Sequence, residues 1–189
     1  MRKPAAVLVE AISVVARREA IDRSFAGGWD SFVSLVPNAT LCTDGQLARV
    51  GLTDPKAVER FVNSLKSHGL VFLSQAKCVD IAVVDQQRGP TKPCEWLEFA
   101  QIPFGKEGAR VAACWLFEGP SMVAGPHVPG LEFDLAAPSG WTYEGSLSER
   151  FTFVPNEDVQ ERLEYKRTEN GIDVFLNTST GREVYKPRD

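Results

Sequence analysis

Histidine is scarce in this sequence, and none of the familiar spacings of metal ligands occurs in it. The 189 residues include two histidines, His68 and His127, and no HxH or HExxH pattern. The cysteines occur singly, without a CxxC pair, at Cys42, Cys78, Cys94 and Cys114. Zinc sites require clustered ligands, so we expect neither a metal nor another cofactor. Isolated thiols are typical of reduced cysteines in a cytoplasmic protein rather than of a disulfide framework.

The sequence also lacks a long apolar run and an excess of positive charge. Its most apolar stretch, residues 7–16, contains Glu10 and Ser13 and is shorter than the ~20 residues of a membrane span. No small-residue cleavage site follows this stretch, so we do not expect a secretory signal. The net charge is −4 and lysine and arginine do not cluster, which argues against direct binding of nucleic acid. We therefore expect a cytoplasmic protein that contacts neither nucleic acid nor a membrane.

What the sequence does have is the composition of a folded chain, with 43% hydrophobic and 24% charged residues. Residues 7–16 predict one buried strand, and residues 53–69 predict the clearest helix of the chain. After residue 88 the pattern changes to short runs of aromatic and β-branched residues separated by glycine and proline. We predict an α+β fold with two packed subdomains. Residues 1–88 would form a mixed strand and helix unit, and residues 89–189 a mainly antiparallel β unit.

Glycine-containing turns locate further elements of this fold. The pair Gly27-Gly28 divides residues 17–35 into two predicted helices. The pair Asp44-Gly45 lies between two strand-like segments and predicts a short hairpin. Near the C-terminus three strand-like segments, RLEYKRT, IDVFL and REVY, are separated by turns that contain glycine. They predict an antiparallel meander.

Covalent catalysis would require Cys94 and His127. A thiol nucleophile needs a histidine base close in space, and both residues lie in segments rich in glycine and proline. The other three cysteines lie in apolar, strand-like runs, where a free cysteine packs as a small hydrophobic side chain. A thiol enzyme that uses these two residues is therefore one alternative. We favour a non-catalytic role because the sequence contains no nucleophile elbow, P-loop or dinucleotide-binding glycine motif.

Residues 85–96, with the sequence DQQRGPTKPCEW, are the segment best suited to recognise a partner. Two prolines constrain this loop, which carries several polar side chains and ends in a large aromatic residue, Trp96. The competing interpretation is a rigid turn whose tryptophan enters the core. The sequence leaves both interpretations open.

Four segments together resemble immunity proteins, which are small cytosolic bacterial proteins encoded beside polymorphic or type VI secreted toxins: GGWDSFVSLVPN, TLCTDGQLARVGL, DIAVVDQQRGPTKPCEWLEF and YKRTENGIDVFLNTSTGREVY. The resemblance implies a cognate toxin as partner, for example a basic nuclease domain, whose active site the chain would block. Mild acidity would then speed encounter through charge complementarity. The candidate partner-binding residues are Asp44, Asp85, Gln86, Glu95, Trp96 and Glu98.

A small-molecule-binding regulatory module is a further alternative. The alternation of strands and helices in the first half of the chain is compatible with a ferredoxin-like or ACT-like unit. A large apolar pocket with convergent polar groups would favour this alternative over the immunity hypothesis.

Overall fold

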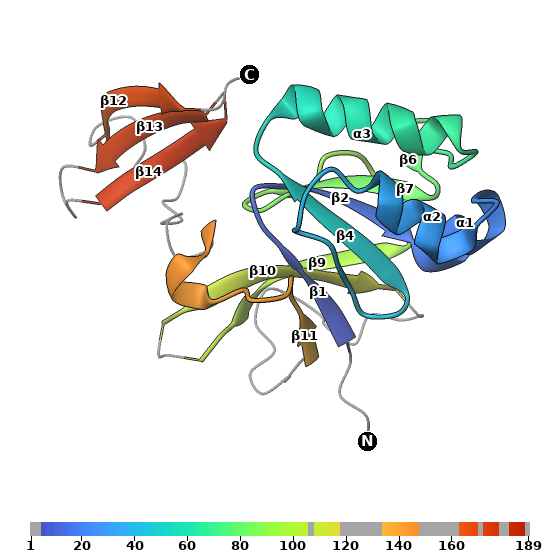
Figure 1. Cartoon of the computed structure of the whole chain (residues 1–189). Helices are drawn as coiled ribbons and strands as arrows, with labels where there is room; N and C mark the ends of the chain where they lie inside the picture. The colour runs from blue at the N-terminus through green and yellow to red at the C-terminus, as the bar shows by residue number, and fades with distance from the viewer. Residues whose placement is uncertain are drawn as a thin grey trace.

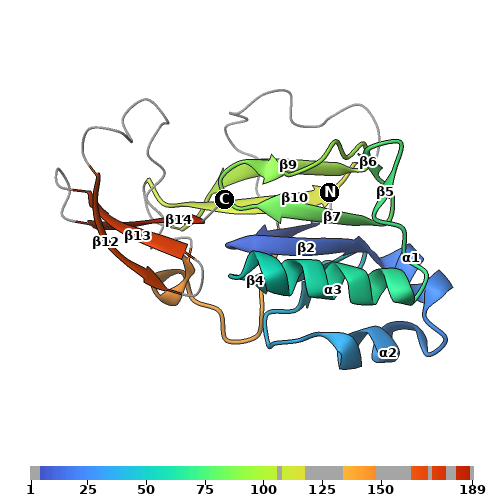
Figure 2. The same cartoon turned by 90° about the horizontal axis from the view of Figure 1, so that it is seen from above.

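The computed structural model describes residues 5–105, 108–117, 134–147, 163–169, 172–177 and 182–187. Its elements are mainly antiparallel strands with three α-helices among the described residues, so the predicted α+β class is confirmed. The helices are α1 (Arg18–Ser24), α2 (Gly28–Leu35) and α3 (Pro55–Ser67). They cover one face of a five-stranded sheet, and a four-stranded sheet covers its other face (Figures 1 and 2).

The two main sheets have interleaved connections. The five-stranded sheet has the order β3-β4-β2-β7-β8 and comprises β3 (Cys42–Thr43), β4 (Leu47–Leu52), β2 (Ile12–Arg17), β7 (Ile81–Asp85) and β8 (Gly89–Pro90). The four-stranded sheet has the order β11-β1-β10-β9 and comprises β11 (Asp134–Ala136), β1 (Ala5–Val9), β10 (Arg110–Leu116) and β9 (Leu97–Pro103). Strand β1 comes from the first half of the chain, whereas its neighbours come from the second half. A division into subdomains at residue 88 stays a prediction.

Two smaller sheets complete the described structure. Strands β5 (Leu73–Ser74) and β6 (Lys77–Cys78) form a short hairpin after α3. Strands β12 (Leu163–Glu169), β13 (Ile172–Asn177) and β14 (Arg182–Pro187) pair antiparallel in sequence order, which confirms the predicted C-terminal meander. The meander lies to one side of the two main sheets, in red in both views (Figures 1 and 2).

Apolar side chains fill three layers. The first lies between the helices and the five-stranded sheet, and it contains Phe32, Phe61 and Leu65. The second lies between the two main sheets, where Val7 of β1 and Val15 of β2 are fully buried. The third lies on the outer face of the four-stranded sheet. Because the five-stranded sheet is covered on both faces, its central strands are apolar at nearly every position.

The prediction of one strand over residues 7–16 is wrong, because the chain turns a corner at Ala11. Ala11 has a φ of 49°, and this turn passes the chain from β1 in one sheet to β2 in the other. Gln86, which is 2% exposed, fixes the corner from the end of β7. The side-chain Oε1 of Gln86 accepts a hydrogen bond from Ala11 N–H at 2.8 Å, and the backbone N–H of Gln86 donates one to Ala11 O at 2.9 Å. The corner falls between the two polar residues of the run, Glu10 and Ser13.

The predicted helix over residues 53–69 is confirmed as α3. The Asp54 side chain caps its first turn by accepting a hydrogen bond from Lys56 N–H at 3.0 Å, and Pro55 occupies the first helical position. Gly69 follows the helix with a φ of 97°, which a side chain would strain. Four apolar side chains of this helix face the five-stranded sheet: Val58, Phe61, Val62 and Leu65.

Candidate functional site

Two consecutive arginines mark the end of the five-stranded sheet at which β2 passes directly into α1. Arg17 is the last residue of β2 and pairs with Leu47 of β4, and Arg18 is the first residue of α1. The Arg17 guanidinium lies over the ring of Trp96, 5.8 Å from its centroid, and the Arg18 guanidinium lies over Trp29 at 4.1 Å. Both arginine side chains are 29% exposed. Each is therefore held against an aromatic ring at the rim of the protein.

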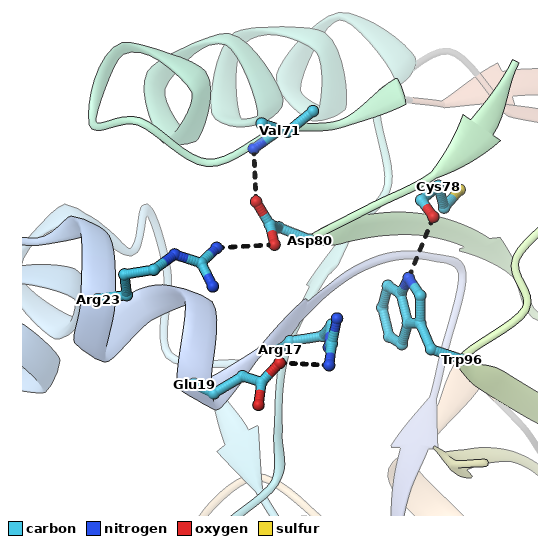
Figure 3. Close-up of polar contacts among 7 residues, drawn as sticks. All are labelled: Arg17, Glu19, Arg23, Val71, Cys78, Asp80 and Trp96. Atoms are coloured by element: carbon cyan, nitrogen blue, oxygen red, sulfur yellow. Dashed lines mark hydrogen bonds and ion pairs between the residues drawn. The ribbon is translucent and has the colours of Figure 1, made fainter. Parts of the chain in front are cut away.

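Arg17 lies between an acidic side chain and an aromatic one. Its Nη2 forms an ion pair with Glu19, and its guanidinium faces the Trp96 ring (Figure 3). Trp96 is half-buried and is fixed in turn, because its Nε1–H donates a hydrogen bond to Cys78 O at 3.3 Å. The backbone oxygen of Trp96 accepts a hydrogen bond from Phe117 N–H at 2.8 Å. Both side chains of the pair are thus positioned without a ligand.

Asp80 is buried beside Arg17 and joins three segments of the chain. Its Oδ1 accepts a hydrogen bond from Arg23 Nη2 at 3.0 Å, and its Oδ2 accepts one from Val71 N–H at 2.9 Å (Figure 3). Its backbone oxygen accepts a hydrogen bond from Arg17 N–H at 3.0 Å. The Arg23 side chain is nevertheless 60% exposed. A charge-assisted bond to a buried carboxylate therefore orients a cation at the surface.

We call this region the Arg17 surface and define it by the residues Arg17, Glu19, Arg23, Lys77, Asp80, Glu95 and Trp96. Lys77 and Glu95 form an exposed ion pair next to Trp96. The surface holds three cationic and three anionic side chains, so its formal charge is balanced although the whole chain carries −4. It therefore differs from the acidic patch that the chain's net charge suggests.

Exposed apolar side chains lie next to the Arg17 surface. Val71 is 43% exposed, and its backbone N–H donates a hydrogen bond to Asp80 Oδ2. Leu73 is 38% exposed and pairs with Cys78, the residue whose backbone oxygen holds the Trp96 ring. Exposed apolar side chains are thus linked through Asp80 and Cys78 to the residues of the Arg17 surface.

The predicted partner-binding residues occupy two ends of the sheet. Glu95 and Trp96 belong to the Arg17 surface. Asp44 lies at the same end, in the turn before β4, and its Oδ1 accepts hydrogen bonds from Gln46 N–H at 2.9 Å and Leu47 N–H at 2.8 Å. It therefore stabilises the predicted hairpin, which is confirmed by the pairing of β3 with β4.

Of the other three predicted residues, Asp85 and Gln86 lie away from the Arg17 surface, and Glu98 follows Trp96 by two residues in β9. Asp85 pairs with Ile12, at the opposite end of β2, roughly 17 Å along the strand from Arg17. The Asp85 side chain caps a turn, and Gln86 is buried at the corner described above. Glu98 accepts a hydrogen bond from Trp115 Nε1–H at 2.7 Å. The structure does not bring all six residues together, and whether any of them binds a partner stays a prediction.

The thiol of Cys94 interacts with another thiol, that of Cys78. A hydrogen bond with Cys78 raises the pKa of Cys94, and burial acts in the same direction. A protonated thiol is a weak nucleophile, so this environment is unlike that of a catalytic cysteine at neutral pH. His127 lies outside the described residues, and its pairing with Cys94 stays a prediction.

A second polar cluster, centred on Arg49 of β4, lies entirely between the two main sheets. Arg49 is 1% exposed, and its guanidinium donates hydrogen bonds to Ser13 Oγ at 2.9 Å, Thr40 O at 3.2 Å and Glu10 O at 3.3 Å. Burial lowers the pKa of Arg49. A Cβ atom added at Gly51 would lie 2.7 Å from Arg49 Nη2, so this glycine leaves room for the guanidinium. The cluster is closed to solvent and serves as an internal cross-link.

Sequence reasoning missed the arginines of both clusters. The pair Arg17-Arg18 at the end of an apolar run that leads into a helix is a signal for the first cluster. Arg49 within the apolar segment LARVGL is a signal for the second, because a long charged side chain in a buried strand requires internal partners. The role of Asp80, which precedes the strand IAVV, was missed as well.

The chain matches no protein-family model, no curated protein and no solved structure. The resemblance to immunity proteins therefore stays a prediction.

Within residues 5–105 and the shorter segments that follow, no three histidine, cysteine or acidic side chains group so as to hold a metal ion. No helix in those segments is long and apolar enough to cross a membrane.

Proposed function

We propose that this chain is a non-catalytic immunity protein that binds a cognate secreted toxin in the bacterial cytoplasm and blocks its active site. The observation that carries the proposal is the fixed pair of Arg17 and Trp96 at the end of the five-stranded sheet. Arginine and tryptophan are the residue types most enriched among the residues that dominate binding energy at protein interfaces. The Arg17 surface is the proposed binding face.

The Arg17 surface has the layout of a protein-binding face. It combines apolar area from Trp96, with the exposed Val71 and Leu73 next to it, and the charged side chains of Arg17 and Arg23, and protein interfaces commonly combine an apolar centre with a polar rim. Each of these charged groups is already held by an internal partner. Binding would therefore immobilise few additional side chains, which favours affinity.

The partner class that we propose is a nuclease toxin with a basic substrate cleft. Exposed carboxylates are available for such a cleft: the side chains of Glu19 and Glu95 within the Arg17 surface are 64% and 76% exposed, and that of Asp22 is 50% exposed. Each of them is paired with a cation of this chain and could turn to a basic residue of the toxin. Charge complementarity of this kind mainly raises the rate of association and the specificity.

The test mixes the purified chain with the toxin encoded by the neighbouring gene. We expect a stable complex at micromolar concentration and loss of toxin activity at one equivalent of the chain. Trp96→Ala should raise the dissociation constant by roughly 30-fold and Arg17→Ala by roughly 10-fold, as measured by isothermal titration calorimetry. Arg60→Ala is the matched control, because Arg60 lies on α3 with a side chain that is 72% exposed.

Two outcomes would contradict different parts of the proposal. If the chain and the toxin do not associate at micromolar concentration, the immunity function is wrong. If they associate but Trp96→Ala and Arg17→Ala bind as tightly as Arg60→Ala, another face binds the toxin.

A further inference from the structure

Two thiols meet where β6 runs alongside residues 92–94. Cys78 N–H donates a hydrogen bond to Pro93 O at 2.8 Å, and Cys78 Sγ lies 3.9 Å from Lys92 O. The thiols of Cys78 and Cys94 interact, and each shifts the pKa of the other. Both pack against the apolar layer between the main sheets, and both are free thiols.

The backbone geometry at this contact suits a disulfide. From the Cys78 Cα atom, the path to the Cys94 Cα atom runs through one N–Cα bond, the 2.8 Å hydrogen bond to Pro93 O and one peptide unit. Standard bond dimensions then limit the separation of the two Cα atoms to about 7 Å. Disulfide bonds in proteins usually have Cα separations of roughly 4.4–6.8 Å, so only a small adjustment of the chain is needed.

The environment of the pair favours reaction of one sulfur. The hydrogen bond from Cys94 lowers the pKa of Cys78, Lys92 acts in the same direction, and burial opposes both. Cys94 is only half-buried, which opens the pair to a small oxidant, whereas Cys78 is 6% exposed. The thiolate is the reactive form of cysteine, and a neighbouring thiol can resolve its oxidised product.

We propose that Cys78 and Cys94 are an oxidative modification site that a peroxide converts to an intramolecular disulfide. The Cys78 thiolate attacks one peroxide oxygen, the O–O bond breaks, and a sulfenic acid and hydroxide form. The Cys94 sulfur then attacks Cys78 Sγ, the S–O bond breaks, and a second hydroxide leaves. With the two thiol protons the products are one disulfide and two water molecules, so the thiols lose two electrons and the peroxide gains them. A dithiol reductant reverses the modification.

The chain contains a matched pair of thiols that should not react. Cys42 and Cys114 lie beside Arg49 between the main sheets, and they are 6% and 0% exposed. Burial raises the pKa of both thiols, although Arg49 opposes this effect. Cys42 is no less exposed than Cys78, but its pKa is raised whereas that of Cys78 is lowered. Both thiols of the Arg49 cluster therefore stay protonated, and a peroxide should leave them unchanged while the protein is folded.

The experiment counts thiols in the full-length folded chain. The reduced protein is treated with hydrogen peroxide, quenched, denatured, alkylated and analysed by intact mass spectrometry. We expect two of the four cysteines to escape alkylation after peroxide treatment, and a dithiol reductant to restore all four. Digestion with trypsin should recover residues 78–88 joined to residues 89–106 through the new bond.

Serine variants separate this pair from the buried pair. Cys94→Ser and Cys78→Ser should abolish the paired loss of two thiols, whereas Cys42→Ser and Cys114→Ser should retain it. Four alkylated cysteines in the wild-type chain, under conditions that oxidise a reference dithiol peptide, would overturn the proposal. A disulfide between other cysteines, or a sulfinic acid that the reductant does not reverse, would also overturn it. None of these readouts requires a toxin, so their outcome is independent of the proposed function.

Discussion

Arg17 and Arg49 lie on the same face of the same sheet, yet they occupy opposite environments. Arg49 of β4 pairs with Val15 of β2, and Arg17 of β2 pairs with Leu47 of β4, so one residue pair, Ala16 and Ala48, separates the two arginines along neighbouring strands. Arg49 is 1% exposed and donates to three internal acceptors, whereas the Arg17 side chain is 29% exposed and contacts Glu19 and Trp96.

The difference between the two arginines arises from their distance to the end of the sheet. A buried guanidinium must satisfy its donors inside the protein, and removal of its partners is strongly unfavourable. A guanidinium at the end of a strand can keep part of its surface in water and remain available to a partner. The same residue type is therefore a cross-link in one position and a candidate recognition group in the other.

The largest effect should come from Arg49→Ala. The change removes the three hydrogen bonds that Arg49 donates to Ser13, Thr40 and Glu10, and it opens a cavity between two sheets. We expect the free energy of unfolding to fall by about 3 kcal/mol or more, as measured by urea denaturation. Arg49→Met keeps most of the side-chain volume, so its free energy of unfolding should fall by less than that of Arg49→Ala. A loss below about 1 kcal/mol for Arg49→Ala would show that the buried cluster contributes little.

The next effect is a loss of stability at alkaline pH, which tests whether water is excluded from the Arg49 cluster. Burial raises the pKa of Cys114 above its ordinary value of 9.0, so the folded protein keeps a proton that the unfolded chain releases above that pH. The free energy of unfolding should therefore be unaffected below pH 9.0 and fall above it, by up to about 1.4 kcal/mol per pH unit for this thiol. Urea denaturation between pH 8 and 10.5 should show that the free energy of unfolding of Cys114→Ala falls less steeply with pH than that of the wild type, by about that slope. Equal slopes in the two proteins would mean that water reaches the cluster.

Arg17→Ala should have a smaller effect on stability than either change. Its ion pair with Glu19 and its contact with Trp96 are half-exposed, and such interactions contribute at most about 1 kcal/mol. We expect the urea midpoint to move little while the affinity for the toxin falls. A loss as large as that of Arg49→Ala would remove the contrast between the two arginines and make Arg17 a structural residue.

The smallest effect should come from Glu95→Gln, which removes the charge of an exposed ion pair with Lys77. Its side chain is 76% exposed, so we expect a change in the free energy of unfolding below about 0.5 kcal/mol. The rate of association with a basic toxin should nevertheless fall, and the loss should shrink at high salt. Stopped-flow measurement at two salt concentrations would show this dependence, and a salt-independent rate would contradict it.

Local patterns predicted much of the fold. The helix over residues 53–69, the hairpin at Asp44-Gly45 and the C-terminal meander depend on caps, turns and periodicity within a few residues. The corner at Ala11 was missed because both strands beside it are buried, and a buried strand has no alternation that marks its end. Gln86, which fixes that corner, lies 75 residues away in the sequence.

The candidate site was predicted in part for the same reason. Trp96 and Glu95 were found because an aromatic residue beside a proline-rich loop is a local feature. Arg17 and Asp80 were missed because their roles depend on contacts between β2, α1 and the start of β7. Arg23 reaches Asp80 across 57 residues, which no pattern in a single segment indicates.

The corner between β1 and β2 also has a consequence for how the chain comes apart. Strand β1 lies between β10 and β11, and β2 lies between β4 and β7, while a single pair of residues connects them. A fragment that ends at residue 88 would leave the backbone groups of Ala5–Val9 without their neighbouring strands. Proteolysis or truncation between the sheets should therefore release an aggregation-prone edge rather than a smaller folded protein.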